Sequence, residues 1–273
     1  MTQPPIPHPP ISHPPPVLVY AVRFVHNAAV VEVNQLGGDG VLWVSTTGAP
    51  DEQAHPVRGP LPMAGPTAPT DPNVQFLALT ITKLSATSPR VAVICSLPIA
   101  DLPHSPFDGL PHFRLRANYA LPTILPASTG DQWAATVIGR DGDKTDDNTV
   151  TAHVGATHQV REGGVIALGA GSGTTSPPQP SPTSELIPFE QAYPILSPRI
   201  FQLETDFNRI TGEGRSRLRT PGHVWAERRW THPFVMSDPN APKLTAVGVG
   251  LAMVSGAGSV RVLVHDFEIF VWP

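Results

Sequence analysis

Proline and glycine interrupt this chain at short intervals and leave little room for a long helix. The 273 residues include 34 prolines and 23 glycines. Proline removes a backbone donor and clashes with the preceding helical turn, and glycine weakens a helix. The segments between them are short and rich in β-branched and aromatic side chains, which favour strands. The sequence therefore predicts an all-β chain.

Alternating apolar and polar residues indicate where the strands lie. Phe113, Leu115 and Ala117 alternate with Arg114 and Arg116, the pattern of a strand with one buried and one solvated face. Turn residues separate many such segments, which is typical of an antiparallel β-sandwich or jelly roll. We expect strands at residues 40–46, 75–84, 90–97, 112–119, 132–140, 148–156, 164–170, 199–210, 222–230, 243–255 and 259–273.

Composition suggests how these strands are organised. Residues 1–16 form a proline-rich arm, and residues 17–170 are expected to form a β-sandwich that begins with a hairpin at residues 17–34. Residues 48–73 lack periodicity, so we expect a long loop there. Residues 171–185 are rich in Gly, Ser, Thr and Pro and form a linker or a large loop. Residues 186–273 then make either a second β-domain or the completion of the first.

The last two predicted strands are apolar on both faces. Residues 243–255 and 259–273 flank a short Ser-Gly-Ala-Gly turn. Strands that are apolar on both faces belong in the middle of a sheet. We therefore expect a central hairpin that closes the sandwich.

Charge, cysteine content and hydropathy argue against several classes of protein. Only 15% of the residues are charged and the net charge is −4, so no broad basic field attracts nucleic acid. Cys95 is the single cysteine and has apolar neighbours, which predicts a buried, unreactive thiol. No segment is apolar for long enough to span a membrane, and the first residues do not form a secretory signal peptide.

The C-terminal part resembles concanavalin-like jelly-roll modules. The resemblance rests on LETDFNR, a polar turn, HVWAERRW and the closing strand VRVLVHDFEIFVW. It implies a jelly-roll fold, which serves lectins, glycosidases and spacers alike.

Four carboxylates raise the question of glycoside hydrolysis. Glu204 and Asp206 lie two residues apart, as do Asp266 and Glu268, so each pair shares one face of its strand. Hydrolysis needs two carboxyl groups that face each other across a cleft. The E-x-D-x-x-E signature of laminarinase-like jelly-roll glycosidases is incomplete, because Arg209 stands where the second glutamate belongs. We therefore expect no catalytic residues and no enzyme activity, with a jelly-roll glycoside hydrolase as an alternative.

One segment carries the residue types of a calcium site. Closely spaced carboxylates suit calcium, but the spacing departs from the EF-hand pattern. A solvated turn is the favoured interpretation, with calcium binding as the alternative, and we expect no other cofactor. The candidate ligands are Asp141, Asp143, Asp146 and Asp147.

Arginines and tryptophans supply the remaining candidates for binding sites. Arg215, Arg217 and Arg219 alternate and would share one strand face. This face is either solvated or an interface that holds an acidic partner or an acidic glycan. Trp225 and Trp230 either belong to the core or stack on sugars.

The arm suggests assembly with other subunits. Proline segments lose little entropy on ordering, so they dock readily along a partner. A leaderless β-sandwich with such an arm is similar to minor tail or capsid-decoration proteins of phage virions. This resemblance implies a non-enzymatic structural protein of the virion that is assembled in the host cytoplasm. Its expected partners are other copies of the chain and other particle proteins, and contact with glycans is an additional role. A lectin-like module is an alternative. The predicted interface prolines are Pro4, Pro5, Pro9, Pro10, Pro14, Pro15 and Pro16.

Overall fold

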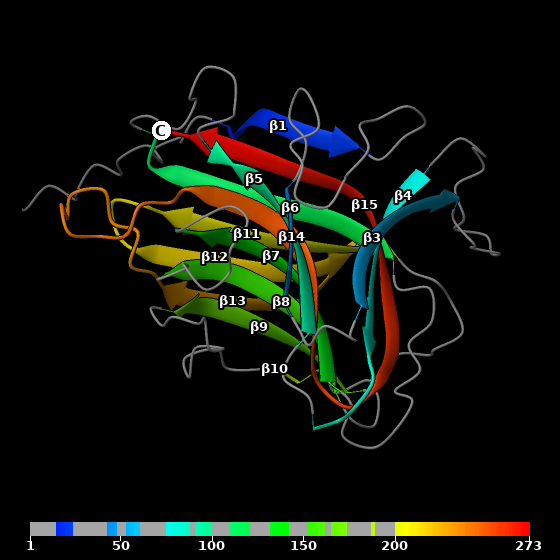
Figure 1. Cartoon of the computed structure of the whole chain (residues 1–273). Coiled ribbons are helices and arrows are strands. Elements are labelled where there is room, and N and C mark those ends of the chain that lie inside the picture. The colour runs from blue at the N-terminus through cyan, green and yellow to red at the C-terminus, as the bar shows by residue number, and fades with distance from the viewer. Residues whose placement is uncertain are drawn as a thin grey trace, which may run out of the picture.

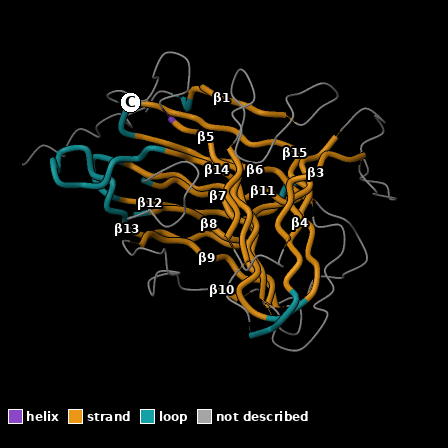
Figure 2. Tube along the Cα trace, in the orientation of Figure 1, coloured by secondary structure: helices purple, strands orange, loops and turns teal. Residues whose placement is uncertain are grey.

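The chain folds into two antiparallel sheets packed face to face (Figure 1). Strands joined by turns make up nearly all of the described residues (Figure 2). The predicted all-β antiparallel sandwich is confirmed. The computed structural model describes residues 15–23, 43–47, 53–60, 75–87, 91–99, 110–120, 132–141, 152–161, 165–173, 187–188 and 200–273.

The eight-stranded sheet is built around the long strand β15, which lies beside β6 along one edge and beside β4 and then β1 along the other. The strands β1 and β15 are the neighbouring blue and red arrows of Figure 1. In spatial order the main path is β13 (His223–Thr231), β12 (Glu213–Thr220), β11 (Ile200–Asn208), β6 (His112–Ala120), β15 (Gly258–Trp272), β4 (Gln75–Lys83) and β3 (Gln53–Pro60), with β1 (Val17–Arg23) beside β15.

The seven-stranded sheet covers one face of the first. It has β14 near its middle, between β7 and β5. Its spatial order is β10 (Ile187–Pro188), β9 (Val165–Gly173), β8 (His153–Arg161), β7 (Gln132–Arg140), β14 (Ala246–Ser255), β5 (Val91–Pro98) and β2 (Trp43–Thr47). Both sheets thus take strands from either side of residues 171–185.

The predicted hairpin of the last two strands is wrong, although both strands lie inside their sheets as expected. β14 belongs to the seven-stranded sheet and β15 to the eight-stranded one. The turn between them crosses from one sheet to the other, and Gly256 and Gly258 adopt positive φ angles of 81° and 132° there. Burial on both faces fits a crossing between two packed sheets as well as it fits a hairpin.

Three other segments differ from their predictions. The expected loop at residues 48–73 contains β3, which is the last strand of its sheet. An edge strand has a neighbouring strand on one side. A proline is tolerated there when its backbone nitrogen faces the open side, because no hydrogen bond of the sheet is then lost. Such a strand can contain Pro56 and Pro60. The polar turn expected before HVWAERRW is the strand β12. The strand predicted at residues 148–156 begins instead at His153.

Two tight turns fix the hairpins that join β11, β12 and β13. The side-chain oxygen of Asn208 accepts hydrogen bonds from the backbone N–H groups of Ile210 and Thr211, at 2.8 and 3.2 Å. Gly212 and Gly222 then adopt φ angles of 73° and 78°, which glycine reaches without strain. These turns set the register of the three strands.

The core fills the space between the two sheets. Phe113, Leu115 and Ala117 of β6 point into it, as predicted from their alternation. Cys95 also lies in the core, fully buried, and burial raises the pKa of its thiol to about 12. The predicted burial of this thiol is confirmed, and its lack of reactivity stays a prediction.

One buried hydrogen bond joins the sheets through polar side chains. The hydroxyl of Tyr119 on β6 lies 2.6 Å from Nδ1 of His158 on β8. The His158 ring packs edge-on against Phe201, with centroids 4.7 Å apart. Burial lowers the pKa of His158 to about 3, because the cationic imidazolium loses its hydration there.

We predict that His158 makes the protein less stable in acid. The unfolded chain protonates this histidine below about pH 6.5, and the folded chain does not do so until about pH 3. The pH-dependent contribution of His158 to the free energy of unfolding is therefore zero above about pH 6.5. Below that pH it destabilises the fold progressively as the pH falls. Between pH 6.5 and 4.5 the wild type should lose about 2–3 kcal/mol more than His158→Gln. Urea unfolding at several pH values measures this difference, and parallel curves for the two proteins would contradict it.

Candidate functional site

The outer face of the eight-stranded sheet, turned away from the core, carries a grid of polar and charged side chains. Strand register places these residues in rows that run across β13, β12, β11, β6 and β15. The end row is Thr231, Glu213, Asn208, His112 and Trp272. The cationic row next to it is Arg229, Arg215, Asp206, Arg114 and Phe270. The middle row is Glu227, Arg217, Glu204, Arg116 and Glu268.

Asp206 is held by arginines from both neighbouring strands. Arg114 on β6 donates from Nε and Nη2 to its two carboxylate oxygens, at 2.6 and 3.0 Å. Arg217 on β12 donates to the same carboxylate at 2.6 Å. Paired donors of this kind fix the geometry of a carboxylate. The three side chains therefore bind β6, β11 and β12 together on the outer face.

Glu204 completes this network and is its most buried member. Its side chain is 2% exposed and forms an ion pair with Arg217, which is 8% exposed. Arg114 also approaches it, at 3.5 Å. Burial is the largest single influence on the pKa of Arg114 and acts to lower it. The hydrogen bond to Asp206 and the negative charges of Asp206 and Glu204 together outweigh burial, so the pKa lies above its ordinary value. Burial dominates at Arg217 and lowers its pKa against the attraction of both carboxylates.

The second predicted carboxylate pair lies on the same outer face, on β15. Arg116 donates to Glu268 at 2.6 Å. Asn118 donates to Asp266 at 2.6 Å, and His265 lies 2.7 Å from the other oxygen of this carboxylate. The fold thus brings all four predicted carboxylates to one face, each in contact with a basic or amide side chain.

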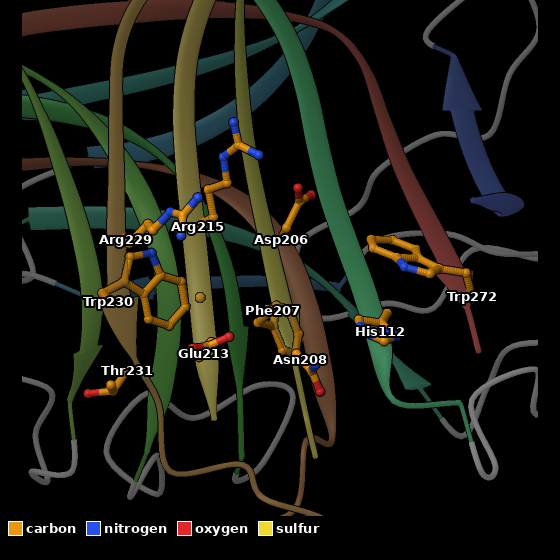
Figure 3. A pocket seen from close by; sticks show the side chains of 11 residues that line it. His112, Asp206, Phe207, Asn208, Glu213, Arg215, Arg229, Trp230, Thr231 and Trp272 are labelled. Atoms are coloured by element: carbon orange, nitrogen blue, oxygen red, sulfur yellow. The ribbon is translucent and has the colours of Figure 1, made fainter. Parts of the chain in front are cut away.

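The end of this face is hollowed into a pocket of about 450 Å³, which we call the end pocket. Its lining residues come from the five strands of the grid, as Figure 3 shows. The end row and part of the cationic row supply most of the lining, and Trp230 adds a second indole ring. The volume lies within the range of small-molecule sites.

Aromatic rings flank the end pocket. Trp272 stacks on His112, with centroids 5.3 Å apart and planes 8° from parallel. His112 donates from Nδ1 to the carbonyl oxygen of Pro273 at 2.8 Å, which orients its ring. The guanidinium carbon of Arg114 lies 5.5 Å from the centre of the Trp272 ring, which adds a cation–π contact.

Trp230 reaches the pocket because Gly214 has no side chain. A Cβ atom at residue 214 would lie 2.5 Å from the Trp230 ring. The indole N–H donates to Ser216 at 2.9 Å, and the ring also packs against the core. Trp230 therefore fits both interpretations of its sequence position, core residue and site residue.

The predicted arginines differ in their surroundings. Arg215 lines the end pocket and forms an ion pair with Glu227 of β13; its hydrogen bond lowers the pKa of Glu227 below the ordinary value. Arg217 is buried among carboxylates. Arg219 borders a hollow of about 290 Å³ at the opposite end of the outer face, beside the β12–β13 turn. Arg217 therefore does not belong to a uniformly solvated stripe.

The other candidates lie away from the end pocket. Trp225 donates to the hydroxyl of Thr220 at 2.8 Å. The Asp141 carboxylate accepts the backbone N–H of Ala152 at 2.5 Å, and the described residues hold no cluster of three His, Cys, Asp or Glu that fits a metal ion. Pro15 and Pro16 are exposed. The remaining candidates, Asp143, Asp146, Asp147, Pro4, Pro5, Pro9, Pro10 and Pro14, lie outside the described residues, so calcium binding and the docking arm stay predictions.

Sequence reasoning missed most residues of this site, among them Trp272, His112 and Arg229. Trp272 and His112 meet only through the pairing of β15 with β6, and no local pattern signals that pairing. Arg229 was not among the predicted interface arginines, and its place opposite Arg215 follows only from the β12–β13 register. Within the part of the chain that the structure describes, no helix is long and apolar enough to cross a membrane.

Comparison with known proteins supports the fold. No protein-family model matches the sequence, and neither does any curated protein. Lectin I from Ulex europaeus, solved with the methyl glycoside of α-L-fucose, has a TM-score of 0.50 at 12% identity, over 93% of this chain and 98% of the lectin. Endo-1,3-β-glucanase from Streptomyces sioyaensis has a TM-score of 0.45 at 13% identity, over 98% of this chain and 99% of the enzyme.

The likeness to the lectin shows that this chain has the concanavalin-like jelly-roll fold. The resemblance predicted for the C-terminal part is thereby confirmed at the level of fold. Identity this low says nothing about the site. Neither structure is a virion protein, so the predicted role in a phage particle has no support from these comparisons and stays a prediction.

We predict that Arg217 stabilises the fold by compensating Glu204. Arg217→Met leaves two neighbouring carboxylates, one of them buried, and should cost about 3 kcal/mol in the free energy of unfolding at pH 7. The double variant Arg217→Met/Glu204→Gln removes the uncompensated charge and should recover more than half of this loss. Urea denaturation measures both variants. A single variant as stable as the wild type, or a double variant with no recovery, would contradict the account.

Proposed function

We propose that the protein binds carbohydrate non-covalently in the end pocket. The observation that carries this proposal is the Trp272–His112 stack beside the polar side chains of the end row and the cationic row. A sugar ring has an apolar face of C–H groups and a rim of hydroxyls. Aromatic faces bind the first, and oriented carboxylate, amide and guanidinium groups bind the second.

The polar groups of the pocket are fixed before a ligand arrives. Asp206 is held by two arginines, and the side chain of Asn208 is engaged in the turn that follows β11. Groups that are already ordered lose little entropy on binding. This preorganisation favours recognition of a defined arrangement of hydroxyls.

We propose further that binding is not followed by hydrolysis. A glycosidase needs one carboxyl group that donates a proton and one that attacks or activates water. Glu204, Asp206 and Glu268 form ion pairs with arginines, which stabilise the charged form of each carboxylate. Asp266 is engaged by Asn118 and His265. These contacts favour a binding protein over the alternative of a glycoside hydrolase.

The lectin likeness supports this choice. The Ulex europaeus lectin that shares the fold was solved with a fucoside. A glycan-binding module is also compatible with the predicted virion role, in which contact with surface glycans was an additional function. The present proposal does not depend on that role.

The test is a glycan array probed with the purified full chain, followed by calorimetry on the best ligand. Trp272→Ala removes the stacking surface and should weaken binding about fivefold or more, because one aromatic contact is worth about 1 kcal/mol beyond its buried area. Trp225→Ala is the matched control, since this indole lies outside the end pocket, and should bind like the wild type. Thermal melting checks that both variants are folded.

Three results would count against the proposal. Absence of binding to any glycan on the array would overturn it. Equal affinity of Trp272→Ala and wild type would remove the end pocket from the account. New reducing ends after incubation of the ligand with the wild type would show turnover and favour the hydrolase.

A further inference from the structure

The cationic row has an excess of positive charge at the end pocket. It contains Arg229, Arg215 and Arg114 against the single carboxylate of Asp206. That carboxylate is also shared with Arg217 from the middle row. From the middle row, Glu227 pairs with Arg215, whereas Glu204 and Glu268 are paired with arginines of their own row.

Arg229 forms no close ion pair within the described part of the chain, although its charge helps to lower the pKa of Glu227. It stands directly opposite Arg215 across the β12–β13 ladder, and like charges in this position repel. Glu227 forms its ion pair with Arg215. Among the described residues, no hydrogen bond or ion pair within 4 Å engages Arg229, which is exposed and lines the end pocket.

Arg215 also retains unused donors. Its contact to Glu227 is made through one terminal nitrogen, and the other terminal nitrogen takes no part in that contact. A guanidinium pair with free donors fits an anion, because each fork binds carboxylate or sulfate oxygens in parallel. An anion between Arg215 and Arg229 would also relieve their repulsion.

We infer that the end pocket selects sugars that carry a carboxylate or a sulfate group, bound by Arg229 and Arg215 while the sugar ring stacks on Trp272. This inference rests on the proposed function and names its ligand class. The acidic group lies over the cationic row, and the uncharged hydroxyls lie over the end row.

Glu213 provides a second variant with the opposite expected effect. It is the carboxylate of the end row, and its side chain receives only a long hydrogen bond of 3.4 Å from Thr211. It lies two residue pairs away from Arg215 and Arg229 along the ladder, on the same face of the sheet, so it repels an acidic ligand. Glu213→Gln should therefore strengthen the binding of an acidic sugar and Arg229→Gln should weaken it.

The experiment measures affinity for two pairs of ligands that differ in charge. The first pair is oligogalacturonate and its full methyl ester, and the second is a carrageenan oligosaccharide and its desulfated form. The wild type should bind one acidic member at least tenfold more tightly than its neutral counterpart, and this preference should shrink as salt is raised. Arg229→Gln should weaken acidic binding about five- to tenfold and Glu213→Gln should strengthen it about two- to fivefold. Arg261→Gln, which removes the same charge from a distant exposed position on β15, should change neither.

Each outcome has a definite meaning. Preference for the carboxylated or the sulfated ligand, with opposite effects of the two variants, supports the inference and identifies the acidic group. Equal binding of charged and neutral ligands, or an unchanged Arg229→Gln, overturns it while the proposed function stands. Weakening by Arg261→Gln as strong as that by Arg229→Gln shows attraction to net charge alone and also overturns it. Absence of binding to these ligands and to every glycan of the array overturns the proposed function as well.

Discussion

The packing of two sheets around one apolar core determines where every charged group of the central strands can lie. On β6 and β11, residues such as Phe113, Leu115 and Phe207 fill the inner face, so the intervening arginines and carboxylates must point outwards. Crowded on one face, they compensate one another across β12, β11, β6 and β15. The outer face is therefore ordered by charge pairing in the same way that the inner face is ordered by apolar contact.

This pairing separates the outer face into two parts with different properties. In the middle row both arginines are paired with carboxylates, and Glu204 is almost fully buried. These pairs stabilise the sheet. At the end of the face Arg229 has no close ion-pair partner among the described residues, because the carboxylate that β13 contributes to these rows, Glu227, pairs with Arg215. The same strand ends bring Trp272 onto His112. The end pocket thus lies where the network of ion pairs on the outer face ends.

Local pattern predicted much of this fold and little of the site. Alternation in residues 112–119 gave the inner and outer faces of β6, and the spacing of Glu204 and Asp206 placed both on one face of β11. The crossing of β14 and β15 between sheets escaped prediction, because burial on both faces is common to a crossing and a hairpin. The contact of His112 with Trp272 depends on the register of strands far apart in sequence, which no short motif contains.

The most direct test of the central claim is an NMR titration that follows the tryptophan indole N–H signals of the ¹⁵N-labelled full chain with the best glycan ligand. Binding in the end pocket should shift the signals of Trp272 and Trp230, which line it, and leave that of Trp225 in place. Shifts confined to Trp225, or saturation with ligand without movement of the Trp272 signal, would contradict the account and move the binding site elsewhere on the molecule.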